Sequence, residues 1–490
     1  MADFFDTETP LPESVDLFSD LGLSNSILRA LKKIHFEKPT EIQSKMIPIA
    51  LQGRDVCASA VTGSGKTAAF LIPTIERILR HSSTEKTTKS VILSPTRELA
   101  AQTFAVLNQL IQFTSLTGLL ITGGASNVKE EEIRLLSRPD FLVATPGRLV
   151  DHLQNCEDFS LENVMIFVLD EADRLLIEGF QPQIEEIHKK IPSERQSILV
   201  TATFTSPVSR LAEMALKNPV RIALDALYGV SDQLAQEFVR VEHSNREASL
   251  IAICSRLCTK RTVIFCSQKK TAHRVYALFK SLGMPVAELH GDMSQIRRYD
   301  ALASFSSGTN EFLVASDVAA RGLDIPGIEN VINYNMPKKM THYVHRVGRT
   351  ARIGNTGRAI SFIGEEDKEL MKEVIKNSHN PVHKRTIPAD IIESSQKKVE
   401  EVKEKLNELL MEERELTQLE IAERAIVRAR EIAENPSSAL PQPKRSFISK
   451  DKRDPKDASK IASSIRIKKS KMEAREKKIF GKKNQKKTKE

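Results

Sequence analysis

Val56-Cys57-Ala58-Ser59-Ala60-Val61-Thr62-Gly63-Ser64-Gly65-Lys66-Thr67 is an apolar strand that runs into a glycine-rich turn. An apolar-periodic segment, Ala68 to Leu79, follows this turn and predicts a helix. Glycines let backbone N–H groups approach oxygen anions, and a helix N-terminus adds partial positive charge. Lys66 can reach the terminal phosphates of a nucleotide, and the Thr67 hydroxyl can bind Mg²⁺. The stretch predicts a phosphate-binding loop; an ordinary glycine turn is the alternative, because Ala60 replaces the first glycine of the motif.

A second stretch, Val164 to Asp173, is an apolar strand that ends in Asp170 and Glu171. A nucleotide hydrolase needs carboxylates at such a position: Asp170 would bind magnesium, and Glu171 would orient or deprotonate water. An apolar strand followed by acids is by itself a common surface turn. Because the Lys66-Thr67 loop lies upstream on the same chain, we predict that the two stretches form one nucleotide site.

The sequence Asp170-Glu171-Ala172-Asp173 is also the signature of the DEAD-box RNA helicases, and the chain resembles this family over residues 18 to 392. The resemblance implies an α/β fold with two tandem RecA-like parallel-sheet domains. It also implies ATP and Mg²⁺ as cofactors and RNA as the partner. The implied catalytic residues are Lys66, Asp170, Glu171, Arg346 and Arg349, with Thr67 and Asp170 as metal ligands.

Length and composition restrict the class of protein. With 490 residues, 40% of them hydrophobic, the chain is long enough for two or three domains with separate cores. It has no run of 18 apolar residues, and residues 1 to 18 are acidic, so we expect neither a membrane span nor a secretory signal. The five cysteines lack a paired CxxC spacing. We expect buried thiols, with metal ligation by Cys254 and Cys258 as the alternative.

The net charge of +9 is unevenly distributed along the chain. Residues 441 to 490 hold 19 Lys and Arg against 6 Asp and Glu, a charge of +13, which leaves −4 for residues 1 to 440. The near-neutral body must therefore bind a polyanion with a localised surface. The tail can add salt-sensitive attraction to phosphates that does not depend on sequence.

The N-terminal segment is expected to contact the base of the nucleotide. Residues 1 to 17 are predicted to be a disordered lead, and Thr40 precedes a helix that we expect to continue to about Leu51. The resemblance makes this the adenine-binding element, in which Gln43 pairs with the purine edge, Phe36 stacks on it and Phe18 supports the loop. The family usually has glycine where His35 stands. The implied nucleotide-binding set is Phe18, Phe36, Gln43, Thr62, Gly63, Ser64, Gly65, Lys66, Thr67 and Asp324.

Short Val/Ile/Leu runs alternate with helical segments through the first domain. The expected strands are residues 91–93, 119–122, 141–144, 165–169 and 197–200. This rhythm predicts a parallel sheet with helices on both faces and functional loops at the carboxyl ends of the strands. We place the first domain at residues 18–225 and a hinge at residues 226–233.

Three loops after these strands carry hydroxyl, arginine and glycine residues. In the family such loops contact the RNA backbone, and the residues implied are Pro95, Thr96, Arg97, Gly124, Thr145 and Arg148. Hydroxyls, guanidinium groups and exposed N–H groups suit phosphate and 2′-OH contacts without reading bases. Each loop taken singly is a helix cap or a turn, but their order favours RNA contact. Thr201 and Thr203, with His345, are implied to couple the acidic site to RNA.

A second βα series starts at about Gln236, with strands at residues 262–266, 286–289, 311–315 and 330–334 and a helix at 267–280. It has no phosphate loop of its own. Two such domains with one loop predict that a single nucleotide binds in the cleft between them. We place the second domain at residues 234–392.

The second domain is expected to supply the opposite wall of that cleft. Arg346 and Arg349 are three residues apart, which would put both on one helical face able to reach a γ-phosphate. A basic helical triplet is usually a solvated face, but this segment resembles the family's arginine-finger motif. The resemblance also implies RNA contacts from Ser267, Gln268, Gly291, Ser316 and Arg321.

The pattern changes after Ile392. Val399, Val402, Leu406, Leu409 and Leu416 follow a heptad spacing in which Glu413 occupies a core position. We expect a helical extension over 393–434 that packs on the second domain, with a free coiled coil as the alternative, and a disordered basic tail over 435–490. The tail segment 441–447 resembles the DEAD-box branch that acts in assembly of the large ribosomal subunit, which implies a nuclear, nucleolar location. That branch usually has a long N-terminal extension, where this sequence has 17 residues.

The predicted function is an RNA-stimulated ATPase that separates RNA strands locally or remodels RNA–protein complexes, as a monomer, in ribosome biogenesis and pre-rRNA processing. Closure of the two domains around ATP would bend one RNA strand and release the other, so ATP and RNA would favour each other's binding. Two alternatives stay open: an ATP-dependent RNA clamp or scaffold that does not unwind, and a DNA helicase.

Overall fold

The computed structural model describes residues 4–6, 9, 11–61, 63–81, 86–123, 128–224, 233–317, 327–351, 356–378, 380–413 and 415. The predicted hinge apart from its last residue, the end of the predicted helical extension and the basic tail lie outside these residues. So do four of the predicted site residues: Thr62, Gly124, Arg321 and Asp324.

The first domain is built on a seven-stranded sheet whose strand pairs are all parallel. Across the sheet the order is β3 (Gly118–Ile121), β4 (Phe141–Ala144), β2 (Ser90–Leu93), β5 (Ile166–Leu169), β6 (Gln196–Thr201), β1 (Val56–Ser59) and β7 (Val220–Ala223). Alternate residues of a strand face opposite cores: in β5, Ile166 and Val168 join one apolar cluster, and Phe167 and Leu169 join the other. Both faces of the sheet are therefore buried, as expected for parallel strands.

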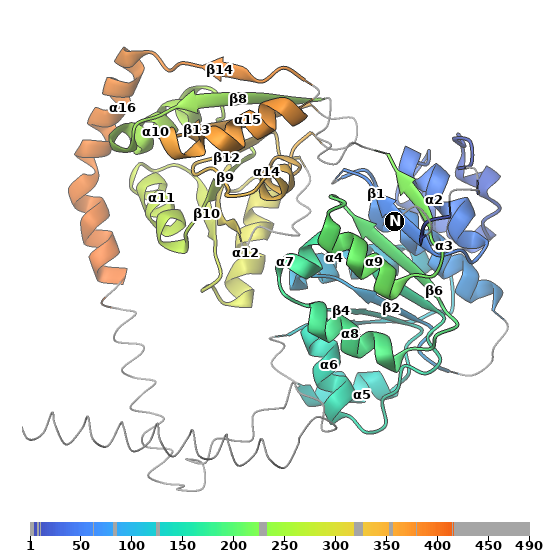
Figure 1. Ribbon diagram of the computed structural model, residues 1–490. Helices are drawn as coiled ribbons and strands as arrows, with labels where there is room; N and C mark the ends of the chain where they lie inside the picture. The colour runs from blue at the N-terminus through green and yellow to red at the C-terminus, as the bar shows by residue number, and fades with distance from the viewer. Residues whose placement is uncertain are drawn as a thin grey trace, which may run out of the picture. The chain divides into compact units, whose positions relative to one another are not determined.

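Helices cover both faces of this sheet (Figure 1). One core includes residues of α1 (Asn25–Lys33), α2 (Glu41–Leu51), α3 (Lys66–Arg80) and α4 (Arg97–Ile111), with the short helix η2 (Phe18–Leu21). The other includes residues of α5 (Val128–Leu136), α6 (Pro146–Asn155), α7 (Ala172–Ile177), α8 (Gln181–Lys190) and α9 (Ser206–Ala215). Functional residues are therefore expected in the loops at the carboxyl ends of the strands.

The second domain repeats this topology. Its parallel sheet has the order β10 (Val286–Leu289), β11 (Phe312–Ser316), β9 (Thr262–Cys266), β12 (Asn330–Asn333), β13 (Gly357–Ile363), β8 (Leu234–Arg240) and β14 (His383–Arg385). If the strands of each domain are numbered from the first, both sheets have the order 3-4-2-5-6-1-7. Its helices are α10 (Arg246–Arg256), α11 (Lys269–Ser281), α12 (Gln295–Ser306), α14 (Met340–Val347), α15 (Lys368–Asn377) and α16 (Ala389–Glu401).

The predicted strands are confirmed with ends that differ by one residue at most. Four strands were not predicted: β7, β8, β13 and β14. Burial alternates along β7, and β14 consists of His383, Lys384 and Arg385. Neither has the continuous apolar run that marks a central parallel strand, so an apolar search misses such edge strands.

The lead before the first domain is attached to it. Asp6 forms a parallel bridge with Val220 of β7, and its carboxylate accepts a hydrogen bond from Arg54. The Arg221 guanidinium lies 5.4 Å from the ring centre of Phe5 and 4.6 Å from that of Phe204. The prediction of a disordered lead is therefore wrong for residues 4–6, because aromatic and ion-pair contacts hold them.

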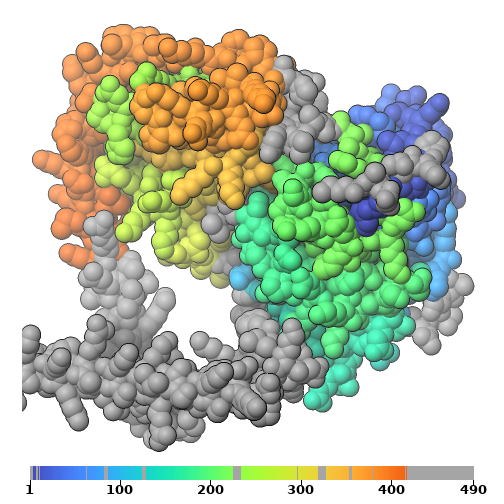
Figure 2. Space-filling view, in the orientation of Figure 1, coloured from blue at the N-terminus to red at the C-terminus, as the bar shows by residue number. Residues whose placement is uncertain are grey.

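The chain after Ile392 packs on the second domain, as predicted. Helix α16 lies against α10 (Figure 1), and residues 403–413 continue in helical conformation. Leu406 is 1% exposed in the core formed by α10, α11 and the sheet, and Val399, Val402 and Leu409 pack around it. In the space-filling view this segment, in deep orange, covers one side of the second domain (Figure 2). Leu416 lies outside the described residues.

The cysteines are thiols, and four of the five are buried, as predicted: Cys57, Cys254, Cys258 and Cys266. Burial raises the pKa of Cys57 and of Cys266 to about 12, so these thiols stay protonated at neutral pH. Among the helices of the described residues, none combines the length and apolar character that crossing a membrane requires.

Candidate active site

The glycine-rich turn connects β1 to α3 at the carboxyl edge of the first sheet. Gly63 and Gly65 have φ angles of +87° and +92°, a backbone conformation that side chains disfavour. Lys66 begins α3 and is buried, and its Nζ donates to the carbonyl oxygens of Ala60 at 2.6 Å and Val61 at 2.7 Å. Burial lowers the pKa of Lys66 to about 8, against the opposing charges of Glu171 and Asp170. The ammonium and the two acids therefore share one buried site.

Gln43 is built into the support of this turn. Its Oε1 accepts the N–H of Thr40 at 2.9 Å, as in a capping box, so the predicted helix start at Thr40 is confirmed. Its Nε2 donates to the carbonyl oxygen of Gly65 at 3.1 Å. A Cβ atom at Gly65 would lie 2.6 Å from Gln43 Nε2, so this position has no room for a side chain.

The two aromatic residues predicted beside Gln43 differ in exposure. Phe18 is 4% exposed and packs in the first core, which fits a supporting role. Phe36 is 38% exposed, so its ring is accessible for stacking. His35, where the family usually has glycine, has a φ angle of +59°. The turn therefore keeps the left-handed conformation even with a histidine.

The acidic pair follows β5 directly. Burial, and then the charge of Glu171, raises the pKa of Asp170 to about 7. Burial disfavours the charged form of Glu171 as well, but the guanidinium groups of Arg174 and Arg349, together with His345, outweigh it and lower the pKa of this carboxyl. Glu171 has a φ angle of +48°, a conformation that costs a non-glycine residue about 1–2 kcal/mol. Glu171 is thus kept ionised in a strained turn.

Asp173 joins the two domains. Its Oδ2 accepts hydrogen bonds from Thr203 Oγ1 at 2.7 Å and from Thr203 N at 3.2 Å, and lies 3.0 Å from His345 Nε2. Thr201 Oγ1 in turn donates to the carbonyl oxygen of Thr203 at 2.9 Å. The predicted coupling residues Thr203 and His345 therefore meet on one buried carboxylate, and Thr201 supports Thr203.

Arg174 completes this network, although it was not among the site residues predicted from the sequence. Its Nε lies 2.9 Å from His345 Nδ1, and its Nη1 lies 2.9 Å from Glu171 Oε2. Arg174 is 3% exposed. Its position directly after the acidic motif is the only sequence signal for it, since its role depends on a histidine 171 positions away.

The two predicted arginine fingers have different surroundings. Arg346 forms a two-pronged ion pair with Asp317 and donates to Asn333 Oδ1 at 3.1 Å and Asn335 O at 2.6 Å, all in its own domain. Arg349 Nε donates to the His345 carbonyl at 3.0 Å, and its charge lowers the pKa of Glu171.

The expectation of a shared helical face for these arginines is wrong. Helix α14 ends at Val347, and Gly348 is its C-cap residue, so Arg349 lies in the turn beyond the helix. Of the two guanidinium groups, that of Arg349 is the one among the main causes that lower the pKa of Glu171.

The predicted RNA-facing residues of the first domain lie at the ends of its strands. Pro95 precedes Thr96, which caps α4 by accepting the N–H of Leu99 at 3.2 Å. A Cβ atom at Gly123 would lie 3.3 Å from the Arg97 guanidinium, so these two loops touch. Thr145 is the N-cap residue of α6.

Arg148, also predicted to contact RNA, is held by carboxylates. Its guanidinium lies 2.8 Å from Glu131 and 2.9 Å from Asp151, and its side chain is 10% exposed. His152 Nε2 contacts the same Glu131 oxygen at 2.9 Å. The arginine therefore fixes α6 against α5 in this structure.

The described residues of the second domain that were predicted to contact RNA also lie at the ends of its strands or in the loops that follow them. Ser267 N donates to Asn335 Oδ1 at 3.2 Å, and Gln268 is the N-cap residue of α11. Ser316 ends β11, and a Cβ atom at Gly291 would meet no other atom within 4 Å. Arg298 of α12 also pairs with Glu98 of the first domain at 2.6 Å, a contact that the sequence did not indicate.

These groups fit a nucleotide and a divalent cation. Asp170 Oδ2 is buried without a hydrogen-bond partner among the described residues, which leaves one carboxylate oxygen for a hard cation. The Gly63–Gly65 turn offers backbone N–H groups at the start of a helix, and Lys66 lies beside it. Carboxylate, hydroxyl and ammonium groups are the donor set that a magnesium nucleotide requires.

Comparison with known proteins gives matches over most of the chain. The DEAD/DEAH box helicase profile matches residues 40–211, and the helicase conserved C-terminal domain profile matches residues 245–354. The chain is 43% identical over 458 residues to the probable ATP-dependent RNA helicase ddx27 of Dictyostelium discoideum, covering 92% of this chain and 58% of that protein. It is 41% identical to the ATP-dependent RNA helicase DRS1 of Phaeosphaeria nodorum, covering 95% of this chain and 59% of the relative. The chain thus spans under two thirds of these curated relatives.

Solved structures agree with this fold. S. cerevisiae Dbp5 bound to RNA and ADP BeF3 aligns with a TM-score of 0.70 and 28% identity, covering 79% of this chain and all of that chain. Mss116p bound to ssRNA and AMP-PNP aligns with a TM-score of 0.71 and 26% identity, covering 80% of this chain and 84% of the other. The two matched profiles, the repeated RecA-like sheets and the Asp170-Glu171-Ala172-Asp173 motif establish that this chain belongs to the DEAD-box family of RNA helicases.

Proposed function

We propose that the protein is an RNA-stimulated ATPase that separates RNA strands locally or remodels RNA–protein complexes. The observation that carries this proposal is the Asp173 carboxylate, which contacts Thr203 of the first domain and His345 of the second. Glu171 lies two residues away and is paired with Arg174, which also contacts His345. Hydrolysis at the acidic pair is therefore linked to the position of the second domain.

Lys66, Thr67 and Asp170 are the residues that would hold ATP and Mg²⁺. When bound, Mg²⁺ supplies positive charge that stabilises the phosphate oxygens. Gln43 and Phe36 are the groups for the adenine base. Because Gln43 Nε2 also contacts the Gly65 carbonyl, recognition of the base is connected directly to the phosphate loop.

Glu171 and Arg349 would then act on the reaction itself. Arg174, Arg349 and His345 hold the pKa of Glu171 below its ordinary value despite burial, so Glu171 is an ionised carboxylate that can orient or accept a proton from water. Arg349 would neutralise charge on the terminal phosphate. Since Arg349 comes from the second domain, full activity would require both domains to be in place.

RNA would be held through its backbone at the carboxyl edges of both sheets. Pro95, Thr96, Arg97, Thr145 and the neighbouring Gly124 would serve the first domain, with Arg148 positioning α6. Ser267, Gln268, Gly291, Ser316 and Arg321 would serve the second. Hydroxyl and N–H donors favour phosphate and 2′-OH groups, which supports RNA over DNA.

The variant Glu171→Gln tests the proposed function. It removes the ionised carboxylate and keeps the shape of the side chain, so we expect RNA-stimulated ATP hydrolysis to fall by about 100-fold or more while ATP and RNA still bind. Fluorescent-nucleotide binding and steady-state phosphate release measure the two effects. Unchanged turnover would remove Glu171 from its assigned role.

The choice between the proposed activity and its alternatives depends on two measurements. Stimulation of ATP hydrolysis by DNA as strong as by RNA would favour a DNA helicase. RNA binding that depends on ATP, without multiple-turnover separation of a short RNA duplex, would identify an RNA clamp or scaffold. Sedimentation would test the expectation of a monomer.

We also propose that the RNA is pre-rRNA in the nucleolus, where the protein would act in ribosome biogenesis with assembly factors. The support is the resemblance of residues 441–447 to the large-subunit assembly branch and the +13 charge of residues 441–490. Deleting residues 441–490 should lower RNA affinity mainly at low salt. Imaging, together with crosslinking of the protein to cellular RNA, would test the location and the transcript.

A further inference from the structure

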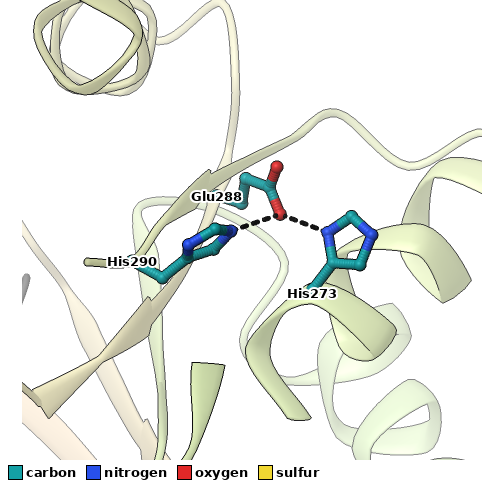
Figure 3. A group of neighbouring side chains, drawn as sticks. All are labelled: His273, Glu288 and His290. Atoms are coloured by element: carbon teal, nitrogen blue, oxygen red, sulfur yellow. Dashed lines mark hydrogen bonds and ion pairs between the residues drawn. The ribbon is translucent and has the colours of Figure 1, made fainter. Parts of the chain in front are cut away.

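A second polar cluster lies in the second domain, outside the residues assigned to ATP hydrolysis and RNA binding. It consists of His273 on α11, Glu288 on β10 and His290 just after that strand (Figure 3). Both imidazole rings approach the same carboxylate oxygen of Glu288, from two sides. His273 Nδ1 lies 2.9 Å from this Oε2 atom, and His290 Nε2 lies 3.5 Å from it.

These separations suit ligands of a single metal ion. Nitrogen and oxygen ligands lie about 2.0–2.2 Å from Zn²⁺, so tetrahedral neighbours are separated by about 3.3 Å. The two measured distances bracket this value, and all three ligand atoms lie within 4.8 Å of one another. The His273 and His290 rings are nearly perpendicular, with an angle of 87°, so their nitrogens converge without stacking. Two imidazoles and one carboxylate are a common donor set for Zn²⁺.

A second carboxylate orients the first histidine. His273 Nε2 lies 2.7 Å from Glu413 Oε2, on the helical extension that packs against α11. Metal-binding histidines usually donate their other ring N–H to a carboxylate, which fixes the tautomer and strengthens the ligand. Tyr276 stacks on the same ring with an interplanar angle of 29°. This contact explains why an acidic residue occupies an apolar position of the extension's heptad pattern.

The cluster is shielded but not closed. The side chains of His273, Glu288 and His290 are 31%, 19% and 14% exposed. An ion could therefore enter from solvent and keep a water molecule as its fourth ligand, as open zinc sites do. A plain ion-pair cluster, in which both histidines only hydrogen-bond to Glu288, is the competing explanation, and the two differ in whether a metal ion binds.

We propose that His273, Glu288 and His290 bind one Zn²⁺ ion, with Glu413 positioning His273. The ion would connect three parts of the second domain: α11, the end of β10 with the Gly291-Asp292 loop, and the C-terminal extension. Lys269 at the start of α11 already pairs with Asp292 in that loop at 2.6 Å. The site would thus fix a predicted RNA-contacting loop relative to the extension.

Zinc titration of the full-length protein without an affinity tag tests this proposal. After removal of metal with a chelator, we expect one equivalent of Zn²⁺ to bind and to raise the melting temperature by about 5 °C at saturation. Co²⁺ bound to the same residues should give the visible absorption typical of tetrahedral coordination. Glu288→Gln should abolish these signals, and Glu413→Gln should weaken binding about tenfold.

Two control variants distinguish Zn²⁺ binding at this cluster from Zn²⁺ binding elsewhere on the protein. His383→Gln, at an exposed histidine of β14, should leave Zn²⁺ binding unchanged. Asp170→Asn, in the nucleotide site, should also leave it unchanged. Hydrogen exchange in residues 403–413 should slow when Zn²⁺ is added to the wild-type protein and should not change in Glu288→Gln.

Two outcomes would overturn the proposal. Absence of saturable one-to-one binding would leave the group as an ion-pair cluster. Equal Zn²⁺ affinity in the wild-type protein and Glu288→Gln would place the ion elsewhere. Because binding, absorption and exchange are measured without ATP or RNA, either result leaves the proposed helicase activity to be judged separately.

Discussion

The two sheets of this chain have the same strand order but different loops. In both, the order is 3-4-2-5-6-1-7 when strands are counted from the start of the domain. The loop after β1 contains Gly63 and Gly65, both with positive φ, whereas the corresponding stretch after β8, Val241 to Asn245, has no glycine. Of these two loops, the one after β1 can therefore bind phosphate through its backbone N–H groups. The same strand order thus does not imply the same function.

The domains are complementary in charge at their acidic and basic edges. The first domain supplies the carboxylates Asp170, Glu171 and Asp173 after β5. The second supplies Arg349, whose charge lowers the pKa of Glu171, and His345, which contacts Asp173. Two domains of the same topology therefore form one site, to which the first contributes carboxylates and the second a guanidinium group and an imidazole.

The largest effect expected from this difference is that of Lys66→Ala. Loss of the ammonium beside the phosphate loop should weaken ATP binding by about 100-fold or more, equivalent to about 3 kcal/mol. His243→Ala, an exposed residue in the corresponding loop of the second domain, should not change ATP affinity. Equilibrium binding of a fluorescent ATP analogue measures both. Similar losses in the two variants would contradict the view that only the first sheet holds the nucleotide.

The second prediction separates the two arginines of the second domain. Arg349→Gln should lower the catalytic rate by about 10³-fold, because the charge of this guanidinium helps to keep Glu171 ionised. Arg346→Gln should instead destabilise the domain by about 3 kcal/mol, because it leaves Asp317 without its paired charge. Single-turnover hydrolysis and urea unfolding distinguish the two effects. A stable but inactive Arg346→Gln would restore that residue as a catalytic group.

The third prediction concerns the C-terminal extension, which covers the second domain. Leu406 is 1% exposed in its core, so Leu406→Ala should cost about 2–4 kcal/mol in that domain. Leu136→Ala, at a 47% exposed position of α5 in the first domain, should change stability by no more than about 0.5 kcal/mol. Urea unfolding gives both values, and hydrogen exchange in α16 shows whether the helix detaches. An equal effect of the two substitutions would mean that the extension contributes nothing to the second domain.

The sequence was sufficient for most of the strands that lie inside the sheets; β8 and β13, which lie inside the second sheet, were the exceptions. Parallel strands buried on both faces need continuous apolar runs, and stretches such as Phe141–Ala144 carry that signal without ambiguity. The phosphate loop and the acidic pair were recognisable for a similar reason, because their chemistry depends on neighbouring residues. The edge strand β14, made of charged residues, carried no such signal.

Contacts between distant residues could not be predicted in this way. Arg346 and Arg349 look equivalent in the sequence, but the end of α14 at Val347 and the Asp317 carboxylate give them different surroundings. Arg148 looks like a phosphate-binding residue, yet Glu131 and Asp151 hold its guanidinium. Such assignments depend on which acid the fold places beside each cation.

The last comparison concerns one left-handed residue in each domain, and the substitution of His35 gives the smallest expected effect. His35 in the first and Arg261 in the second have φ angles of +59° and +47°, a conformation that glycine adopts without strain. His35→Gly should stabilise the protein by about 0.5–1 kcal/mol, because it relieves this strain.

Arg261→Gly relieves the same strain but should destabilise the protein. Arg261 Nη1 donates to Phe305 O at 2.6 Å and its Nε donates to Gly327 O at 2.9 Å, and both bonds would be lost. Each bond contributes about 1.5–3 kcal/mol because the donor is charged, which exceeds the relief of strain. Urea unfolding of both variants measures whether each substitution raises or lowers the free energy of unfolding. A stabilised Arg261→Gly would show that backbone strain, and not these side-chain bonds, dominates at that turn.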